Sequence, residues 1–251
     1  MTVKTVSDIK AMEKVCQLAA QTLVHVAKFI KPGVTTNELD KIVYDYTLSH
    51  EAKPAPLNYH GFPKSICTSV NHCICHGVPD EVPLKEGDVI NVDVTSYKYG
   101  FHGDTSATFF VGQVSEAARK LTEAAEGAMY KGIEAIRPNG TVGDIGFAIH
   151  KFVTRKGYYA VQEIGGHGIG RNFHEDPFVP SFGRKGKGDP LLPFGTITVE
   201  PMINMNALPI VEVAIPNSTI KYYETQDKSP SAQFEHTVLI TDTGYEILTL
   251  P

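Results

Sequence analysis

Four acidic residues of this chain lie inside stretches that otherwise have the composition of buried strands. Asp93 and Asp104 belong to two strand-like runs on either side of a turn at 98–100. Glu200 and Glu235 interrupt two later runs of apolar and β-branched residues, at 196–202 and 231–240. A carboxylate removed from water is unstable without a partner. A fold that buries all four must therefore supply positive charge to them.

The pattern of the first two runs places their carboxylates together. Asp93 and Asp104 are about equally far from the turn, so we expect them to face one another across an antiparallel pair with Cβ atoms ~5 Å apart. Alternation puts Asp93 on one face of its strand and the apolar Ile90, Val92 and Val94 on the other. At an effective dielectric of ~20, two like charges ~4 Å apart repel by roughly 4 kcal/mol. Two divalent cations would neutralise four converging carboxylates.

One histidine lies in a glycine-rich segment that suits a ligand site. His167 belongs to Ile164-Gly-Gly-His-Gly-Ile-Gly, whose glycines let the backbone come close to a ligand. One neutral imidazole among oxygen ligands suits Mn, Fe(II) or Co, and Zn can also bind such a set. Two ions ~3.5 to 4 Å apart commonly activate a bridging water for hydrolysis. Taken singly, each acid could instead be a surface or capping residue and the histidine a structural one. The predicted ligands are Asp93, Asp104, His167, Glu200 and Glu235.

The motifs around these residues resemble those of type I methionine aminopeptidases. They are Asn91-Val-Asp-Val, Gly100-Phe-His-Gly-Asp-Thr-Ser, Gly166-His-Gly-Ile-Gly, Phe173-His-Glu, Val199-Glu-Pro-Met and Gln233-Phe-Glu-His. The likeness extends over nearly the whole chain. It implies the α+β pita-bread fold, in which two pseudo-symmetric halves form a curved antiparallel sheet with helices on one side only. We expect one catalytic domain over 1–251, with halves at about 1–113 and 114–251.

The resemblance also implies a role for each metal ligand. Asp93 would chelate one ion and His167 the other, while Asp104 and Glu235 would bridge both. Glu200 would bind the same ion as His167. Because Glu200 would also contact the bridging water, it is the candidate for carrying the proton of that water to the leaving amine.

Two further histidines and a pocket follow from the same resemblance. His76 and His174 match residues that touch the substrate peptide, where an N–H donor would stabilise charge in the transition state. The methionine pocket would consist of Tyr59, Phe62, Cys67 and Phe173. Near 221–224, where many relatives place a tryptophan over the pocket mouth, this chain has none, and Tyr222 or Tyr223 could substitute. The loop at 181–193 also departs from the family pattern.

Three other histidines adjoin the motifs without an expected role. Alternation along the strands is expected to turn His60, His102 and His236 away from the site. Three of the four cysteines cluster as Cys67, Cys73 and Cys75. Their spacing lacks the second ligand pair of a structural zinc site, so we expect free thiols.

The implied activity is removal of the initiator methionine from peptides and nascent proteins whose second residue is small. Proline-specific peptidases such as aminopeptidase P and prolidase share the ligand set but carry a further amino-terminal domain. A non-catalytic peptide-binding or protein-binding module of the same fold is the alternative from another class, although such scaffolds typically lose ligands. We expect a monomer that acts on nascent N-termini at the ribosome.

Composition argues against other partners. A net charge of −5 gives no electrostatic footprint for nucleic acid. No run approaches the ~20 apolar residues of a membrane span, and the amino terminus lacks the apolar core of a signal peptide. We therefore expect a cytoplasmic protein.

Helix signals divide the chain into two similar parts. We predict helices from about Ser7 to Pro32, from Thr35, from Ser115 to Arg137 and from Thr141 to about Gly157. The junction at 30–39 resembles that at 136–145, with its proline recurring after 106 residues. Such junctions are common, so the repeat could be coincidental. A duplication would also explain the similar interval between Asp93 and Glu200.

Overall fold

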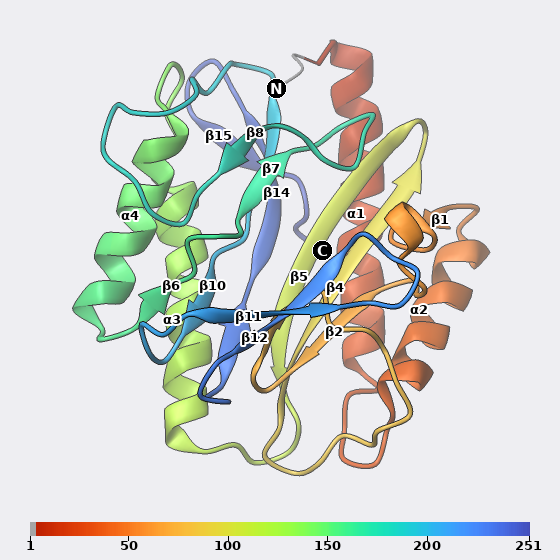
Figure 1. The fold of residues 1–251 in the computed structure, drawn as a ribbon. Coiled ribbons are helices and arrows are strands. Elements are labelled where there is room, and N and C mark those ends of the chain that lie inside the picture. Colours follow the sequence, from red (N-terminus) through yellow and green to blue (C-terminus); the bar gives the residue numbers. More distant parts are fainter. Residues whose placement is uncertain (1–3) are drawn as a thin grey trace.

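A curved antiparallel sheet runs through the centre of the computed structural model, which describes residues 4–251 (Figure 1). Its hydrogen-bonded path is β1-β4-β5-β14-β9-β7-β8, with β2 beside β4 and β15 beside β14. The strands are β1 (Lys53–Pro54), β2 (Cys67–Val70), β4 (Val89–Lys98), β5 (Phe101–Phe110), β7 (Gly166–Gly168), β8 (Glu175–Val179), β9 (Thr196–Val199), β14 (Glu235–Ile240) and β15 (Tyr245–Ile247). The pairing of β5 with β14 joins segments that lie far apart in the sequence.

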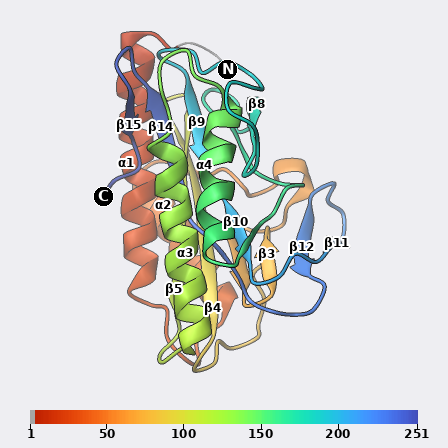
Figure 2. The same ribbon diagram turned by 90° about the vertical axis from the view of Figure 1, so that its left-hand side faces the viewer.

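Four helices cover one side of this sheet, as the resemblance implies (Figure 2). They are α1 (Val6–Ala27), α2 (Thr36–Ser49), α3 (Glu116–Ile133) and α4 (Val142–Arg155). One apolar core joins α1 and α2 to β4, and another joins α3 and α4 to β9 and β14. Within residues 4–251, none of the helices has the length and hydropathy to cross a membrane.

Two smaller sheets and a short helix complete the architecture. The sheets have the orders β13-β10-β6 and β11-β12-β3, and the second lies on the side away from the helices (Figure 2). Their strands are β3 (Cys73–Cys75), β6 (Tyr159–Ala160), β10 (Met202–Asn204), β11 (Ile210–Ala214), β12 (Lys221–Thr225) and β13 (Ser231–Gln233), and the 3₁₀ helix is η1 (Tyr59–Gly61).

The helix starts follow local capping chemistry. The predicted starts at Thr35, Ser115 and Thr141 are confirmed as N-caps. The start at Ser7 is wrong, because Thr5 caps α1 in a capping box with Asp8. The helix ends were placed too late, since α1 ends at Ala27 and α3 at Ile133, and the predicted end of α4 near Gly157 is confirmed within two residues.

The two helix junctions are held to the following loops by the same backbone contacts. These are Gly33–Leu84, Val34–Leu84 and Thr35–Pro83 in the first part, and Asn139–Leu191, Gly140–Leu191 and Thr141–Pro190 in the second. Each contact recurs after 106 residues on the junction and 107 on the loop. A chance similarity of two junctions would not repeat their distant partners. The recurrence supports the two halves proposed from the sequence.

The β4–β5 hairpin sets the register of the first two carboxylates. Its two-residue turn has φ of 56° at Tyr99 and 81° at Gly100, as a type I′ turn requires. Asp104 therefore lies opposite Thr95, and Asp93 lies opposite Ser106. The prediction that the two acids face one another directly is wrong; they are diagonal neighbours on one face. The predicted burial of the apolar face of β4 is confirmed.

Helix α1 packs closely against the strand that carries Asp104. A Cβ atom added at Gly103 would lie 2.6 Å from the backbone nitrogen of Cys16 and 2.7 Å from the carbonyl carbon of Val15. Such contacts are far inside van der Waals distance. Only glycine lets the helix and strand backbones approach in this way.

Candidate metal centre

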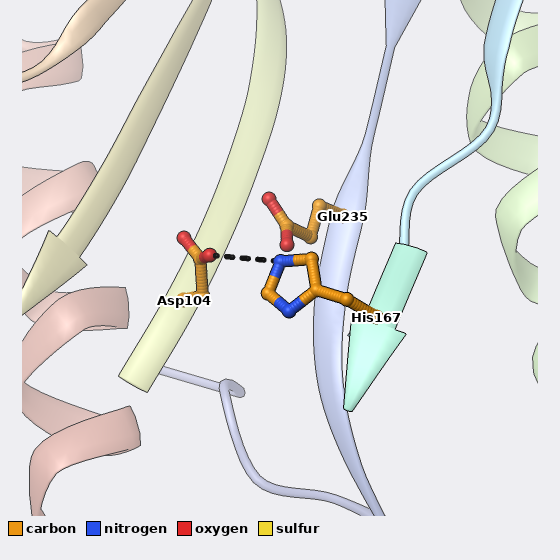
Figure 3. Close-up of side chains that lie close together, drawn as sticks. All are labelled: Asp104, His167 and Glu235. Atoms are coloured by element: carbon orange, nitrogen blue, oxygen red, sulfur yellow. Dashed lines mark ion pairs between the residues drawn. The ribbon is translucent and has the colours of Figure 1, made fainter. Parts of the chain in front are cut away.

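The five predicted ligands converge on one cavity of about 750 Å³. Each comes from a different strand region: Asp93 from β4, Asp104 from β5, His167 from β7, Glu200 just after β9 and Glu235 at the start of β14. One ligand atom from each of Asp104, His167 and Glu235 lies within 4.8 Å of the others (Figure 3). The curved sheet thus gathers side chains that are up to 142 positions apart in the sequence.

A backbone contact orients the imidazole of His167. Its Nδ1 lies 2.9 Å from the carbonyl oxygen of Gly168, which can only accept, so Nδ1 carries the proton. The bare Nε2 of the neutral ring then lies 3.6 Å from Glu200 Oε1 and 3.9 Å from Asp104 Oδ2 (Figure 3 shows the Asp104 pair). Burial lowers the pKa of His167 to about 4, which keeps the ring neutral. Three electron-pair donors facing one another form a natural cation site.

Only some of the carboxylate oxygens at the site accept a hydrogen bond from the protein. Thr95 Oγ1 donates to Asp104 Oδ1 at 2.7 Å. Asp93 Oδ1 and Glu235 Oε1 are buried without a hydrogen-bond partner in the described part of the chain. Buried polar atoms normally have partners, so these two orphaned oxygens fit metal ligands.

Burial makes the acids hold protons when no cation is present. It raises the pKa of Asp93 to about 7 and the pKa of Glu200 to about 8. Burial, reinforced by neighbouring carboxylates, raises the pKa of Asp104 and of Glu235 well above the usual range. A bound cation would replace these protons, because it favours the ionised form of each acid. The donor set therefore fits divalent metal ions.

The structure places His76 on the cavity wall in an unusual conformation. Its φ of 57° is left-handed, which costs a residue with a Cβ about 1–3 kcal/mol. Its Nδ1 lies 3.1 Å from the carbonyl oxygen of Lys221 and so carries the proton of the neutral ring. The remaining Nε2 is then an acceptor rather than the N–H donor expected from the sequence.

His174 lies beside His167 and is held by a tyrosine. The two imidazole rings are 4.2 Å apart, and His174 Nδ1 lies 2.9 Å from the hydroxyl oxygen of Tyr59. Burial, and then the proximity of His167, lowers the pKa of His174 to about 3. Tyr59 thus positions His174 in addition to lining the cavity, a contact that the sequence could not indicate.

All four predicted pocket residues line the same cavity. Phe62 and Cys67 pack against Ile215, which does not line the cavity. The ring centre of Phe173 lies 4.9 Å from that of Tyr59. Where a tryptophan was missing from the sequence pattern, Ile220 lines the cavity. Tyr222 packs behind it against the Phe62 cluster, and Tyr223 packs with the core around Ile74 and Cys75. Of these three residues, only Ile220 lines the cavity.

The prediction that His102 points away from the site is wrong. His102 is two residues before Asp104 on β5, so it shares the face of that ligand. Its ring stacks on Phe173 at a centroid distance of 5.5 Å, and its Nδ1 lies 3.1 Å from the carbonyl oxygen of Gly170. The period-2 pattern could have found it. His236 does lie on the opposite face, where it contacts Thr249.

Two other polar residues of the site, Thr198 and Gln233, were not predicted from the sequence. Both hydrogen-bond to Glu200. Thr198 Oγ1 donates to Glu200 Oε1 at 2.7 Å, and Gln233 Nε2 donates to Glu200 Oε2 at 3.1 Å. Thr198 lies two residues before Glu200, so alternation could have indicated it, whereas Gln233 belongs to β13 and the ligand candidate two residues later, Glu235, begins β14. None of the four cysteines forms a disulfide within residues 4–251.

A buried set of carboxylates and one histidine, open to a peptide-sized cavity, defines the class of metal-dependent hydrolases. The sequence profile of metallopeptidase family M24 matches residues 10–242. The chain belongs to this family, and this confirms the expected pita-bread fold and the use of divalent metal.

Within the family, the chain is similar to methionine aminopeptidases. It is 46% identical over 252 residues to methionine aminopeptidase of Rickettsia prowazekii, covering 100% of this chain and 96% of that protein. The crystal structure of the methionine aminopeptidase from Rickettsia prowazekii superposes with a TM-score of 0.96 at 44% identity and covers 100% of both chains. The resemblance to the type I enzymes is thereby confirmed.

A more distant likeness shows the fold alone. Prolidase from Pyrococcus furiosus gives a TM-score of 0.78 at 23% identity, and the match covers 99% of this chain but 65% of that one. The proline-specific alternative is not favoured, because the methionine aminopeptidases match at higher identity over nearly their full length.

Proposed function

We propose that this protein is a metal-dependent aminopeptidase that removes the N-terminal methionine from peptides and nascent proteins whose second residue is small. The observation that carries the proposal is the continuity of one cavity, which joins the buried ligand set to a wall of aromatic and sulfur-containing side chains. Such a wall suits a thioether side chain, because methionine is unbranched and polarizable. The similarity to methionine aminopeptidases over the whole chain supports the same assignment.

The ligand set suits two divalent ions, with Mn, Fe(II) and Co favoured by its oxygen ligands and Zn also able to bind. Asp93 would hold one ion, His167 and Glu200 the other, and Asp104 and Glu235 would contact both. When bound, the ions would lower the pKa of water to supply a nucleophile and would polarise the scissile carbonyl.

The side chains around the ligands would move the proton and hold the substrate. Glu200 is the proposed proton carrier, and the hydrogen bonds from Thr198 and Gln233 fix the direction of its two oxygens. The bare Nε2 of neutral His76 would accept the N–H of the scissile peptide and so orient that bond. His174, aligned by Tyr59, would contact the peptide on the other side of the cavity.

Selectivity for a small second residue provides the direct test of this function. With Mn or Co added, the purified protein should cleave Met-Ala-Ser at least about 100-fold faster than Met-Leu-Ser, because a bulky second side chain would clash with the cavity wall. Free methionine is measured by a coupled assay. Equal turnover of the two peptides would contradict the proposed specificity. If neither peptide were hydrolysed, the proposed function would be wrong. Cleavage of a Met-Pro dipeptide in preference to both would favour the proline-specific alternative.

A change at His76 should separate substrate orientation from metal binding. We expect His76→Ala to lower kcat about 10- to 100-fold, because an orienting contact is lost, while metal content stays at the level of the unchanged protein. Metal per chain is measured after gel filtration, beside the initial rates. His72→Ala is the matched control on the neighbouring turn and should retain activity. A loss of metal in the His76 variant would contradict this division of roles.

The setting of the reaction belongs to the same proposal. We propose a single catalytic domain over residues 1–251 that works as a monomer in the cytoplasm on the N-termini of nascent chains at the ribosome. The recurring junction contacts support two similar halves within one domain. The alternative of a non-catalytic binding module is not favoured, because all five ligands meet at one cavity.

A further inference from the structure

A second cavity, of about 720 Å³, lies between helices α3 and α4 and the loop that contains Lys185. We call it the basic groove, because six of the residues that line it are cationic: Lys131, Arg137, Lys151, Arg155, Lys156 and Lys185. Asp144 is the one acid of the lining. The groove shares no lining residue with the metal centre, and the motifs of the proposed reaction do not explain it.

The positive charge of the groove is not balanced locally. The single charge of Asp144 offsets at most one of the six cations, and its two oxygens accept from Thr141 N at 2.9 Å and from Gly186 N at 3.0 Å. Lys131 is paired with Glu134 at 2.6 Å. The remaining lysines and Arg155 form no ion pair with any residue in 4–251. In a chain with a net charge of −5, such an excess of cations is a local exception.

The groove also has an apolar floor made of two half-buried phenylalanines. Phe152 lies across α3 at Gly127, where an added Cβ would come within 2.8 Å of the ring. The ammonium groups of Lys151 and Lys185 lie 5.7 and 5.3 Å from the ring centre of Phe147. Lys156 lies 5.1 Å from the ring centre of Phe152. Flexible cations thus cover an apolar surface that a ligand could reach by drawing them aside.

Helix capping does not account for this arrangement. Basic residues in the last turn of a helix stabilise its dipole, which explains Arg155 at the end of α4 and the adjacent Lys156. Lys151 lies a turn earlier, and Lys185 comes from the loop at 181–193 that departs from the family pattern. That loop brings its cation to the same ring as Lys151.

We propose that the basic groove docks an acidic segment of a partner protein. Its carboxylates would pair with Lys151, Arg155 and Lys185, and one apolar side chain would rest on Phe147 and Phe152. A negative segment complements the unbalanced cations, and an apolar anchor uses the floor that charge alone would not require. An extended nucleic acid is disfavoured, because the net charge of −5 repels a polyanion that reaches beyond the groove.

The proposal is tested with an acidic probe that cannot be a substrate. An N-acetylated peptide of six glutamates around a central phenylalanine is titrated into the metal-loaded protein by calorimetry at low salt. Binding should weaken at least about tenfold when the glutamates are replaced by glutamines, and also at 0.5 M NaCl. The variant K151Q/R155Q/K185Q should lose about tenfold in affinity, and F147A severalfold.

A matched control separates the groove from net charge. K10Q/K31Q/K53Q removes the same charge from exposed positions elsewhere and should bind the probe like the unchanged protein. All variants should cleave Met-Ala-Ser at the original rate, so a failed docking proposal would leave the proposed function standing. Absence of probe binding, equal binding by both triple variants, or tighter binding of a uridine 12-mer than of the peptide would each overturn the proposal.

Discussion

Asp104→Asn is expected to reduce kcat/KM more than about 100-fold and to remove most of the bound metal. Even residues that only support metal ligands commonly contribute 10- to 100-fold, so loss of a ligand at the centre of the group should cost more. Asp104 lies within 4.8 Å of ligand atoms of both His167 and Glu235. An amide keeps the size of the side chain but offers no negative charge. Metal per chain after gel filtration and the rate of Met-Ala-Ser cleavage are the two readouts.

A control of the same chemistry lies on the surface. Asp242→Asn makes the identical change in the exposed turn before β15 and should leave rate and metal content unaltered. Circular dichroism shows whether each variant is folded. If folded Asp104→Asn kept both its metal and its rate, Asp104 would not be a ligand.

Chelation of the metal is expected to abolish activity and to destabilise the protein more at pH 8 than at pH 5. In the unfolded chain the four acids ionise near pH 4, whereas burial in the metal-free fold raises the pKa of Asp93 to about 7 and the pKa of Glu200 to about 8. Between about pH 4 and pH 8 the metal-free fold therefore binds more protons than the unfolded chain. Its stability must fall as pH rises through that window.

The metal-loaded protein should not share this loss, because the cations replace the protons. We expect chelation to lower Tm by about 10 °C at pH 8 and by clearly less at pH 5, as a tightly bound ligand would. Thermal unfolding with and without chelator at the two pH values measures the difference. The Asp104→Asn variant is the control, since it has little metal to lose. An equal effect of the chelator at both pH values would show that these acids do not exchange protons for metal.

The convergence of the predicted ligands could be anticipated from the sequence, because these residues violate the pattern around them. An ionisable side chain in a strand of β-branched residues has few explanations, and Asp104, Glu200 and Glu235 each stand out in this way. His167 was marked by the glycines beside it. The motifs that carry the family resemblance then supplied the fold, including helices on one side only.

The features that could not be predicted depend on turn geometry and on contacts between distant residues, which leave no periodic signal in the sequence. The hairpin register was misjudged because Asp93 and Asp104 are only about equally far from the turn. The two-residue turn at Tyr99 and Gly100 pairs Lys98 with Phe101, and this register places Asp93 opposite Ser106. The contact of His174 with Tyr59 joins residues 115 positions apart and leaves no periodic signal. Ile220 was missed for a related reason, since a tyrosine is the more obvious substitute for tryptophan, yet β12 directs its tyrosines into the packing behind the wall.

The absence of a side chain at Gly103 lets α1 contact the strand that carries Asp104, although α1 contributes none of the five predicted ligands. The backbones of α1 and β5 touch at Gly103. The position of the next residue, Asp104, therefore depends on the helix as well as on the sheet. A methyl group at Gly103 would clash with the backbone of α1, so the helix or the strand that carries Asp104 would have to shift. Helix α1 therefore helps to fix the position of β5, and with it the position of Asp104, without contributing a side chain to the site.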